Sequence, residues 1–202
     1  MDELVRNFEF LKEKGFNVAE YGFAESISDA INIANKIGYP VVLKVPFQTH
    51  KTDIGGVLTN IHNVTDLKHL SKEMVSNLEK QGVYFDGLVV QSQIDGIEVI
   101  AGLKEDAVFG KVILFGSGGV LAELIKDVSF RVCPITEKDA EEMINETKAK
   151  VLLGGFRGKS ANVAKLKKFL VKLSHLDVKE IDLNPLIVNN EGCWIVDARI
   201  FK

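Results

Sequence analysis

Cysteine is scarce in this chain, and the cysteines that are present do not form a recognisable site. Cys133 and Cys193 make no Cys-x-x-Cys pair and lie in no cluster with histidine. Isolated cysteines of this kind are typical of buried free thiols in a reducing cytoplasm.

Long apolar runs and an excess of basic charge are also missing. No segment approaches the ~20 apolar residues that a membrane-spanning helix needs. The N-terminal MDELVRNFEF begins with acidic residues and lacks the apolar run of a signal peptide. A net charge of −3 provides no positive field for a nucleic-acid backbone. We therefore expect a cytoplasmic protein with no membrane and no nucleic-acid partner.

The chain is rich in apolar residues arranged with both helical and strand periods. Of its 202 residues, 46% are hydrophobic, enough for a full core in one large domain or two lobes. Predicted helices cover residues 3–14, 26–38, 137–146 and 163–174, and a further helix ending near Glu79 starts after Asn63 or Thr65. Predicted strands cover 41–45, 57–61, 88–94, 98–103, 111–115 and 120–125, and a final hairpin joins 180–188 to 194–198. This mixture predicts an α+β architecture, with a lobe boundary near residues 91–95.

The stretch from Gly38 to Val57, GYPVVLKVPFQTHKTDIGGV, places a strand-end lysine just before a polar, glycine-containing loop. Lys44 follows an apolar strand, where an ammonium is costly unless it is paired or reaches a ligand. A lysine beside glycines, whose N–H groups approach oxygens closely, suits a polyphosphate. His50 in this loop has an imidazole able to attack phosphorus near neutral pH. A snorkelling lysine and a surface histidine are the competing interpretations.

Oxygen-bearing side chains gather near the C-terminus, in the segments EIDLNP and VDAR. Asn184 and Asp197 lie on opposite arms of the predicted last hairpin, and an amide with a carboxylate, completed by phosphate oxygens, suits Mg²⁺. Asp182 and Glu180 share a strand face with Asn184. A solvent-exposed polar face is the competing interpretation. With the lysine and its loop, these residues indicate an enzyme that uses a nucleotide.

Segments spread over most of the chain, in matching order, resemble one family. It is the ATP-grasp β subunit, or C-terminal-type domain, of ADP-forming acyl-CoA synthetases (acetate–CoA ligases), which is related to succinyl-CoA synthetase β. The segments are GYPVVLK, HKTDIGGV, DGLVVQ, IEVIAGLKEDAVFG, VILFGSGG, ELIKDVSFR, the FRG loop, IDLNPLIV and VDAR.

The resemblance implies a single ATP-grasp module over residues 1–202, whose two lobes clamp a nucleotide. The small lobe would cover about residues 22–92 and the large lobe 1–21 plus 93–202. The positions implied for binding ATP or ADP are Lys44, Gly55, Gly56, Gln91, Ser92, Ile94 and Glu98. The implied Mg²⁺ positions are Asn184 and Asp197. Asp182 matches the carboxylate that meets a phosphohistidine, and His50 matches the histidine that relays phosphate toward ADP.

The resemblance also implies the reaction acyl-CoA + ADP + phosphate ⇌ carboxylic acid + CoA + ATP, through phosphohistidine intermediates. The chain has no Gly-x-Gly-x-x-Gly fingerprint for CoA. We therefore expect it to need an α subunit that carries the CoA-binding domain and the catalytic histidine, in an α₂β₂-type hetero-oligomer.

This chain departs from the family pattern at the expected hinge. It reads Gln91-Ser92-Gln93, where the family commonly has Gln-Glu-Met, so a carboxylate that contacts the nucleotide is missing. Ile97 also stands where arginine is frequent before Glu98. Two alternatives therefore stay open: a non-catalytic subunit that keeps the fold, and a carboxylate–CoA ligase subunit of the succinyl-CoA synthetase type.

Overall fold

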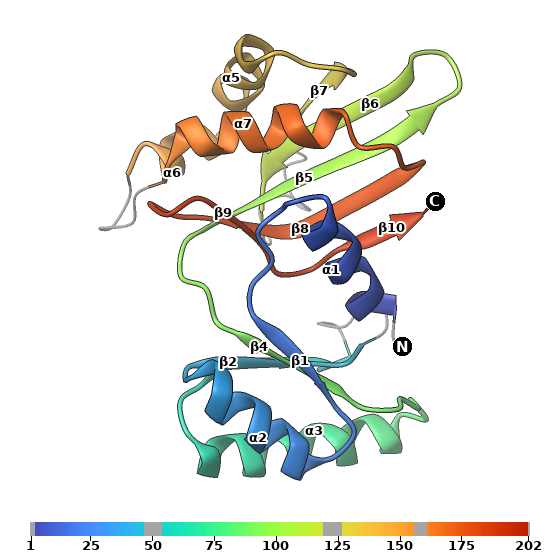
Figure 1. Cartoon of the computed structure of the whole chain (residues 1–202), viewed down its shortest axis with the longest axis vertical. Helices are drawn as coiled ribbons and strands as arrows, with labels where there is room; N and C mark the ends of the chain where they lie inside the picture. The colour runs from blue at the N-terminus through green and yellow to red at the C-terminus, as the bar shows by residue number, and fades with distance from the viewer. Residues whose placement is uncertain (1–2, 47–53, 119–126, 156–160, 202) are drawn as a thin grey trace. The chain divides into compact units, whose positions relative to one another are not determined.

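The computed structural model describes residues 3–46, 54–118, 127–155 and 161–201, which form helices combined with antiparallel sheets (Figure 1). The predicted α+β class is confirmed. Within the described part of the chain, none of the helices is both long enough and apolar enough to cross a membrane.

The chain forms two compact units. The first unit consists of Met1–Phe10 and Ala19–Gln93, and the second consists of Leu11–Val18 and Ile94–Lys202. Helix α1, Glu3–Glu13, contributes residues to both units.

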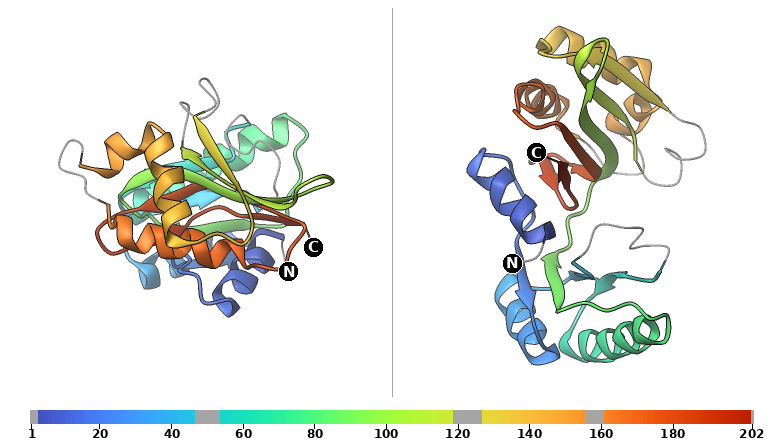
Figure 2. Two further views of the ribbon diagram at one scale, coloured as in Figure 1. Left: turned by 90° about the horizontal axis from the view of Figure 1, so that it is seen from above. Right: turned by 90° about the vertical axis from the view of Figure 1, so that its right-hand side faces the viewer.

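The first unit contains a four-stranded antiparallel sheet in the order β1-β4-β2-β3. The strands are Tyr21–Ala24 (β1), Val41–Lys44 (β2), Val57–Ile61 (β3) and Leu88–Ser92 (β4). Helices α2, Ile27–Ile37, and α3, Val64–Lys80, lie side by side on one face of this sheet, as the blue and green helices of Figure 2 show.

Alternation along the central strand β4 separates the two faces of this sheet. Leu88 and Val90 belong to the apolar core that α2 and α3 cover. Val89 and Gln91 therefore occupy the opposite face, because successive strand residues point to opposite sides. Both are buried, so the face away from these helices is also shielded from water.

Side chains that accept hydrogen bonds from backbone N–H groups start both helices. Ser26 Oγ accepts from the N–H of Asp29 at 3.1 Å, which fixes the start of α2. Asn63 Oδ1 accepts from the N–H of Asp66 at 2.9 Å at the start of α3. Of the two start residues predicted for α3, Asn63 is therefore the cap, and Thr65 lies inside the first turn.

The second unit contains a six-stranded antiparallel sheet with the order β10-β8-β5-β6-β7, and β9 pairs with β8. Its strands are Ile97–Asp106 (β5), Gly110–Ser117 (β6), Val128–Val132 (β7), Glu180–Val188 (β8), Cys193–Ile195 (β9) and Arg199–Phe201 (β10). Its helices are Glu137–Glu146 (α5), Ala149–Leu153 (α6) and Val163–Ser174 (α7). Helices α5 and α7 pack against each other and contact the sheet (Figure 1).

The predicted final hairpin is only partly correct. Its first arm is β8, as expected, but of the second arm, predicted at 194–198, only residues 194–195 lie in a strand, β9, and β10 begins after it at Arg199. Asp197 lies in the interruption, where its own Oδ1 accepts from the N–H of Ala198 at 3.1 Å. This local hydrogen bond competes with the ladder and explains the break. The predicted strand at 120–125 lies outside the described residues.

We predict that Asn63→Ala lowers the free energy of unfolding by about 1 kcal/mol, because the N–H of Asp66 loses its acceptor. The matched control is Thr65→Ala, two residues along the same helix, where alanine is the better helix former and the stability should stay constant or rise slightly. Urea unfolding followed by circular dichroism measures both. Equal losses in the two variants would show that the cap is assigned wrongly.

Candidate functional site

Lys44 and Gln91 form a buried polar pair in the first unit. Lys44 ends β2, and its Nζ donates to Gln91 Oε1 at 2.7 Å. The two side chains are 6% and 1% exposed. Gln91 lies opposite Val42, and Lys44 lies opposite Val89, so both side chains occupy the face away from α2 and α3. The amide oxygen carries no net charge, so this bond orients the ammonium without neutralising it.

The nitrogen atom of the Gln91 side-chain amide is in a different situation from its oxygen. Its Nε2 is buried, and among the described residues it has no hydrogen-bond partner. A buried donor left without an acceptor costs about 1–3 kcal/mol. An acceptor oxygen or nitrogen of a ligand placed beside Lys44 would remove that cost. The pair is therefore chemically suited to bind an anionic, oxygen-rich group.

The glycine loop begins and ends beside this pair. Residues 47–53, which include the predicted His50, lie outside the described residues. The two ends are held together, because the N–H of Val45 donates to the carbonyl of Gly56 at 2.9 Å. Gly55 has a φ of +72°, a left-handed conformation that favours glycine. The predicted residues Gly55 and Gly56 thus lie next to the end of β2, where Lys44 is.

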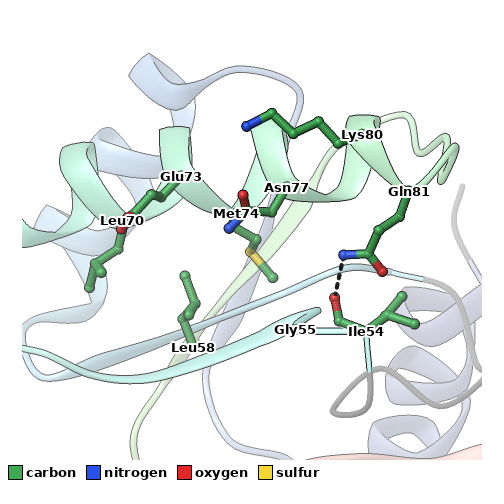
Figure 3. A pocket seen from close by; sticks show the side chains of 9 residues that line it. All are labelled: Ile54, Gly55, Leu58, Leu70, Glu73, Met74, Asn77, Lys80 and Gln81. Atoms are coloured by element: carbon green, nitrogen blue, oxygen red, sulfur yellow. Dashed lines mark hydrogen bonds between the residues drawn. The ribbon is translucent and has the colours of Figure 1, made fainter.

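A cavity of about 590 Å³ lies between β3 and α3 in the same unit (Figure 3). Its lining includes the apolar side chains of Leu58, Leu70 and Met74, and Gln81 Nε2 reaches the carbonyl of Ile54 at 3.5 Å beside it. Gly55 is the one predicted site residue that lines it. Glu73, Asn77, Lys80 and Gln81 add polar groups to the lining. The cavity lies on the helix side of the sheet, whereas the Lys44 side chain occupies the opposite face, so the two regions are separate.

In the second unit, the strand register aligns the predicted metal residues. Leu186 of β8 lies opposite Ile195 of β9, and Asp182 lies opposite Arg199 of β10. Extended across residues 196–198, which belong to no strand, the same register would put Asp197 level with Asn184. The donors are a carboxylate and an amide oxygen, which are suited to Mg²⁺ together with water and phosphate oxygens. The described residues contain no cluster of three or more histidine, cysteine, aspartate or glutamate side chains that could hold a metal.

Several charged groups act on the carboxyl group of Asp182 and shift its pKa. Burial raises the pKa of its carboxyl group, the Arg199 guanidinium opposes that rise, and the carboxylates of Asp197 and Glu180 add to it. These groups are therefore close enough to act on one another. Arg199 is a charged neighbour of Asp182 that no motif indicated, and the pairing of β10 with β8 puts it there.

Glu98 and the hinge residues occupy the ends of central strands. Ser92 ends β4, and its N–H donates to the carbonyl of Glu20 at 2.7 Å. Ile94 begins the second unit, and Glu98 is an exposed residue near the start of β5. The N–H of Gly118 donates to the carbonyl of Glu98 at 3.1 Å. A Cβ at Gly118 would lie 2.6 Å from the backbone carbon of Glu98, so this glycine is needed for close approach to the strand.

Comparison with known proteins identifies the family of this chain. The family model for the ATP-grasp domain matches residues 4–201. The chain is 39% identical over 203 residues to the beta subunit of the ADP-forming acetate–CoA ligase I of Pyrococcus furiosus, covering 95% of this chain and 88% of that subunit. This chain belongs to the ATP-grasp family, in the group of β subunits of ADP-forming acetate–CoA ligases. The predicted ATP-grasp fold is confirmed.

The chain also matches one much longer relative and one solved structure of similar length. The chain is 43% identical to the ADP-forming acetate–CoA ligase I of Archaeoglobus fulgidus. The match covers 94% of this chain but only 29% of the length of that relative. Among solved structures, the dinucleotide-forming acetyl-coenzyme A synthetase 1 of Ca. Korarchaeum cryptofilum, in complex with coenzyme A and Ca-AMPCP, is similar with a TM-score of 0.90 and 37% identity. That match covers 98% of this chain and 91% of the other.

We predict that the stability effect of Asp182→Asn depends on pH. A carboxyl group whose pKa is raised on folding binds its proton more tightly in the folded state. It therefore stabilises the fold at low pH, and this contribution is lost as the pH rises toward the folded-state pKa. The variant should thus gain stability relative to the wild type as the pH rises above the ordinary aspartate pKa, as measured by urea unfolding at each pH.

Asp106→Asn provides a control of opposite sign. The backbone N–H groups of Phe109 and Val108 lower the pKa of the Asp106 carboxyl group, so its ionised form stabilises the fold. That variant should lose stability relative to the wild type as the pH rises toward the ordinary aspartate pKa, below the range in which Asp182→Asn gains stability. If both variants showed the same pH trend, the prediction that ionisation of Asp182 destabilises the fold would be wrong.

Proposed function

We propose that this chain is the nucleotide-binding part of an ADP-forming acyl-CoA synthetase, which catalyses acyl-CoA + ADP + phosphate ⇌ carboxylic acid + CoA + ATP. The observation that carries this proposal is the buried Lys44–Gln91 pair, whose Gln91 Nε2 lacks an acceptor among the described residues. Membership of the family of ADP-forming acetate–CoA ligases adds support.

In this proposal, Lys44 supplies a positive charge to the phosphates of ATP or ADP, and Gln91 both orients that charge and donates from Nε2. Gly55 and Gly56 bring backbone N–H groups to the phosphate oxygens, a role that glycine suits because it has no Cβ. The base lies along the hinge at Ser92 and Ile94. Glu98, just past the hinge, is the remaining nucleotide contact. These roles belong to the two predicted lobes, 22–92 and 1–21 with 93–202.

Asn184 and Asp197 are the proposed Mg²⁺ ligands. Bound Mg²⁺ neutralises the charge of the transferred phosphoryl group. The chain's own contribution is to hold an amide oxygen opposite a carboxylate oxygen, through the common register of β8 with β9 and β10.

Asp182 is the proposed partner of the phosphohistidine, and His50 is the proposed relay of phosphate toward ADP. Burial raises the pKa of the Asp182 carboxyl group, and the Arg199 guanidinium across from it opposes that rise. In this proposal, the carboxyl oxygens of Asp182 accept a hydrogen bond from an imidazole N–H and hold that ring in place. The crystal structure of the Ca. Korarchaeum cryptofilum enzyme with Mg-AMPPCP has a phosphohistidine segment pointing towards the nucleotide binding site, which supports this arrangement.

The remaining chemistry requires a partner. This chain spans 29% of the Archaeoglobus fulgidus relative, and the Pyrococcus furiosus relative is a beta subunit. We propose that an α subunit carries the CoA-binding domain and the catalytic histidine, and that an α₂β₂-type assembly acts in the cytoplasm.

We predict that Lys44→Met weakens the binding of Mg-ADP by roughly tenfold to a hundredfold, the loss expected for a hydrogen bond to a charged group. Lys68→Met is the matched control, because Lys68 is an exposed lysine on α3, and its affinity should equal that of the wild type. Isothermal titration of the full-length protein with any partner that co-purifies measures both. Absence of Mg-ADP and Mg-ATP binding to the wild type would overturn the proposed function.

We also predict that Asp197→Asn weakens Mg-ADP binding and raises the Mg²⁺ concentration needed for half-saturation, because one carboxylate ligand becomes neutral. Adding Asn184→Asp should restore part of the affinity, since the pair again offers one amide and one carboxylate. Titration of Mg²⁺ at fixed ADP measures the three proteins. If the double variant bound no better than the single one, the pairing of Asn184 with Asp197 would be wrong.

A further inference from the structure

The chain passes from the first unit to the second between Gln93 and Ile94. The backbone just before this point is fixed within the first unit. The N–H of Ser92 donates to the carbonyl of Glu20 at 2.7 Å, and the N–H of Gln93 donates to the carbonyl of Pro40 at 3.1 Å. The end of β4 is thus tied to two other segments before it leaves the sheet.

The side chain of Gln93 adds a second attachment, to Asn60 in β3. Gln93 Oε1 accepts from the N–H of Asn60 at 2.6 Å, and Gln93 Nε2 donates to Asn60 Oδ1 at 2.8 Å. Both ends of the Gln93 amide are therefore held by one residue. Two hydrogen bonds at fixed geometry restrict the side chain far more than one would. We call this pair the amide clasp.

Asn60 adopts an unusual backbone conformation to make the clasp. Its φ is +59°, and it is the one non-glycine residue with positive φ in the described part of the chain. Asparagine tolerates this left-handed region better than most residues. Strained backbone of this kind persists where the surrounding structure requires it, often beside functional sites.

The backbone just after the crossing is fixed within the second unit. The carbonyl of Asp95 accepts from Asn189 Nδ2 at 3.1 Å. Asn189 is itself rigid, because its Oδ1 accepts from the N–H groups of Glu191 and Gly192 at 3.0 and 3.1 Å. Ile94 is therefore the single residue between two positions that are each tied to their own unit.

We propose that Asn60 and Gln93 are positioning residues, whose clasp holds the hinge backbone of Ser92 and Ile94 in the geometry that the nucleotide base requires. The proposal rests on the nucleotide site of the proposed function. A methionine at position 93 would have no N–H to donate to Asn60 Oδ1, so the clasp requires an amide at this position.

Three variants distinguish the loss of the amide clasp from a general loss of folding stability. Gln93→Met removes both hydrogen bonds, and Asn60→Gly removes the one to Oδ1 while keeping the positive φ and the backbone N–H. Asn60→Asp keeps both, because a carboxylate oxygen replaces Oδ1. We expect the Kd for Mg-ADP to rise roughly tenfold in Gln93→Met and roughly threefold in Asn60→Gly, with Asn60→Asp close to the wild type.

The experiment is isothermal titration with Mg-ADP on the full-length protein, with any partner that co-purifies, at a temperature where all four proteins are folded. Steady-state rates provide a second readout, in which the KM for ADP should rise while kcat stays nearly constant. Equal affinities in all four proteins, or a fall in kcat with unchanged KM, would overturn the positioning role and leave the proposed function intact. Absence of binding to the wild type would overturn the proposed function and the positioning role with it.

Discussion

The ammonium group of Lys44 lies inside the first unit, and its hydrogen bond to Gln91 requires β2 and β4 to pair in one register. A charge this far from water is tolerated only with a partner or a ligand. The same register puts Val41, Leu43 and Val90 into the core under α2 and α3. A shift by one residue would move Lys44 to the helix side and the core residues away from it. The polar pair and the apolar core therefore depend on the same strand pairing.

In the second unit, strand register also determines which oxygen-bearing side chains are neighbours. The pairs of β8 with β9 and of β8 with β10 share one register, which extended across residues 196–198 would put Asp197 level with Asn184. Asp182 and Arg199 are paired residues of β8 and β10. The proposed oxygen ligands and their charged neighbours therefore depend on the register of β8.

Much of the fold could be predicted from local patterns. Helices α5 and α7 have the predicted bounds, because a cap or a clear apolar period marks each of them. Strands β1, β7 and β10 and helix α6 were missed. All four are short, with three to five residues each, and β1 pairs with β4, which is far along the chain. Among the candidate site residues, Lys44, Gln91, Asp182, Asn184 and Asp197 could be proposed from their motifs. The contacts of Arg199, Asn60 and Gln93 could not, since single polar residues carry no period.

Local patterns were enough to predict the α+β class and the family, because apolar periodicity and short motifs are local properties. They also marked a lysine, a glycine pair and an Asn–Asp set as candidate site residues. Which of these side chains meet could be seen only in the folded chain. Strand register places Gln91 beside Lys44 and leaves Gln91 Nε2 without an acceptor among the described residues. It also places Arg199 across from Asp182 and Asn60 beside Gln93. Register is fixed by the packing of the whole sheet, which no local segment contains.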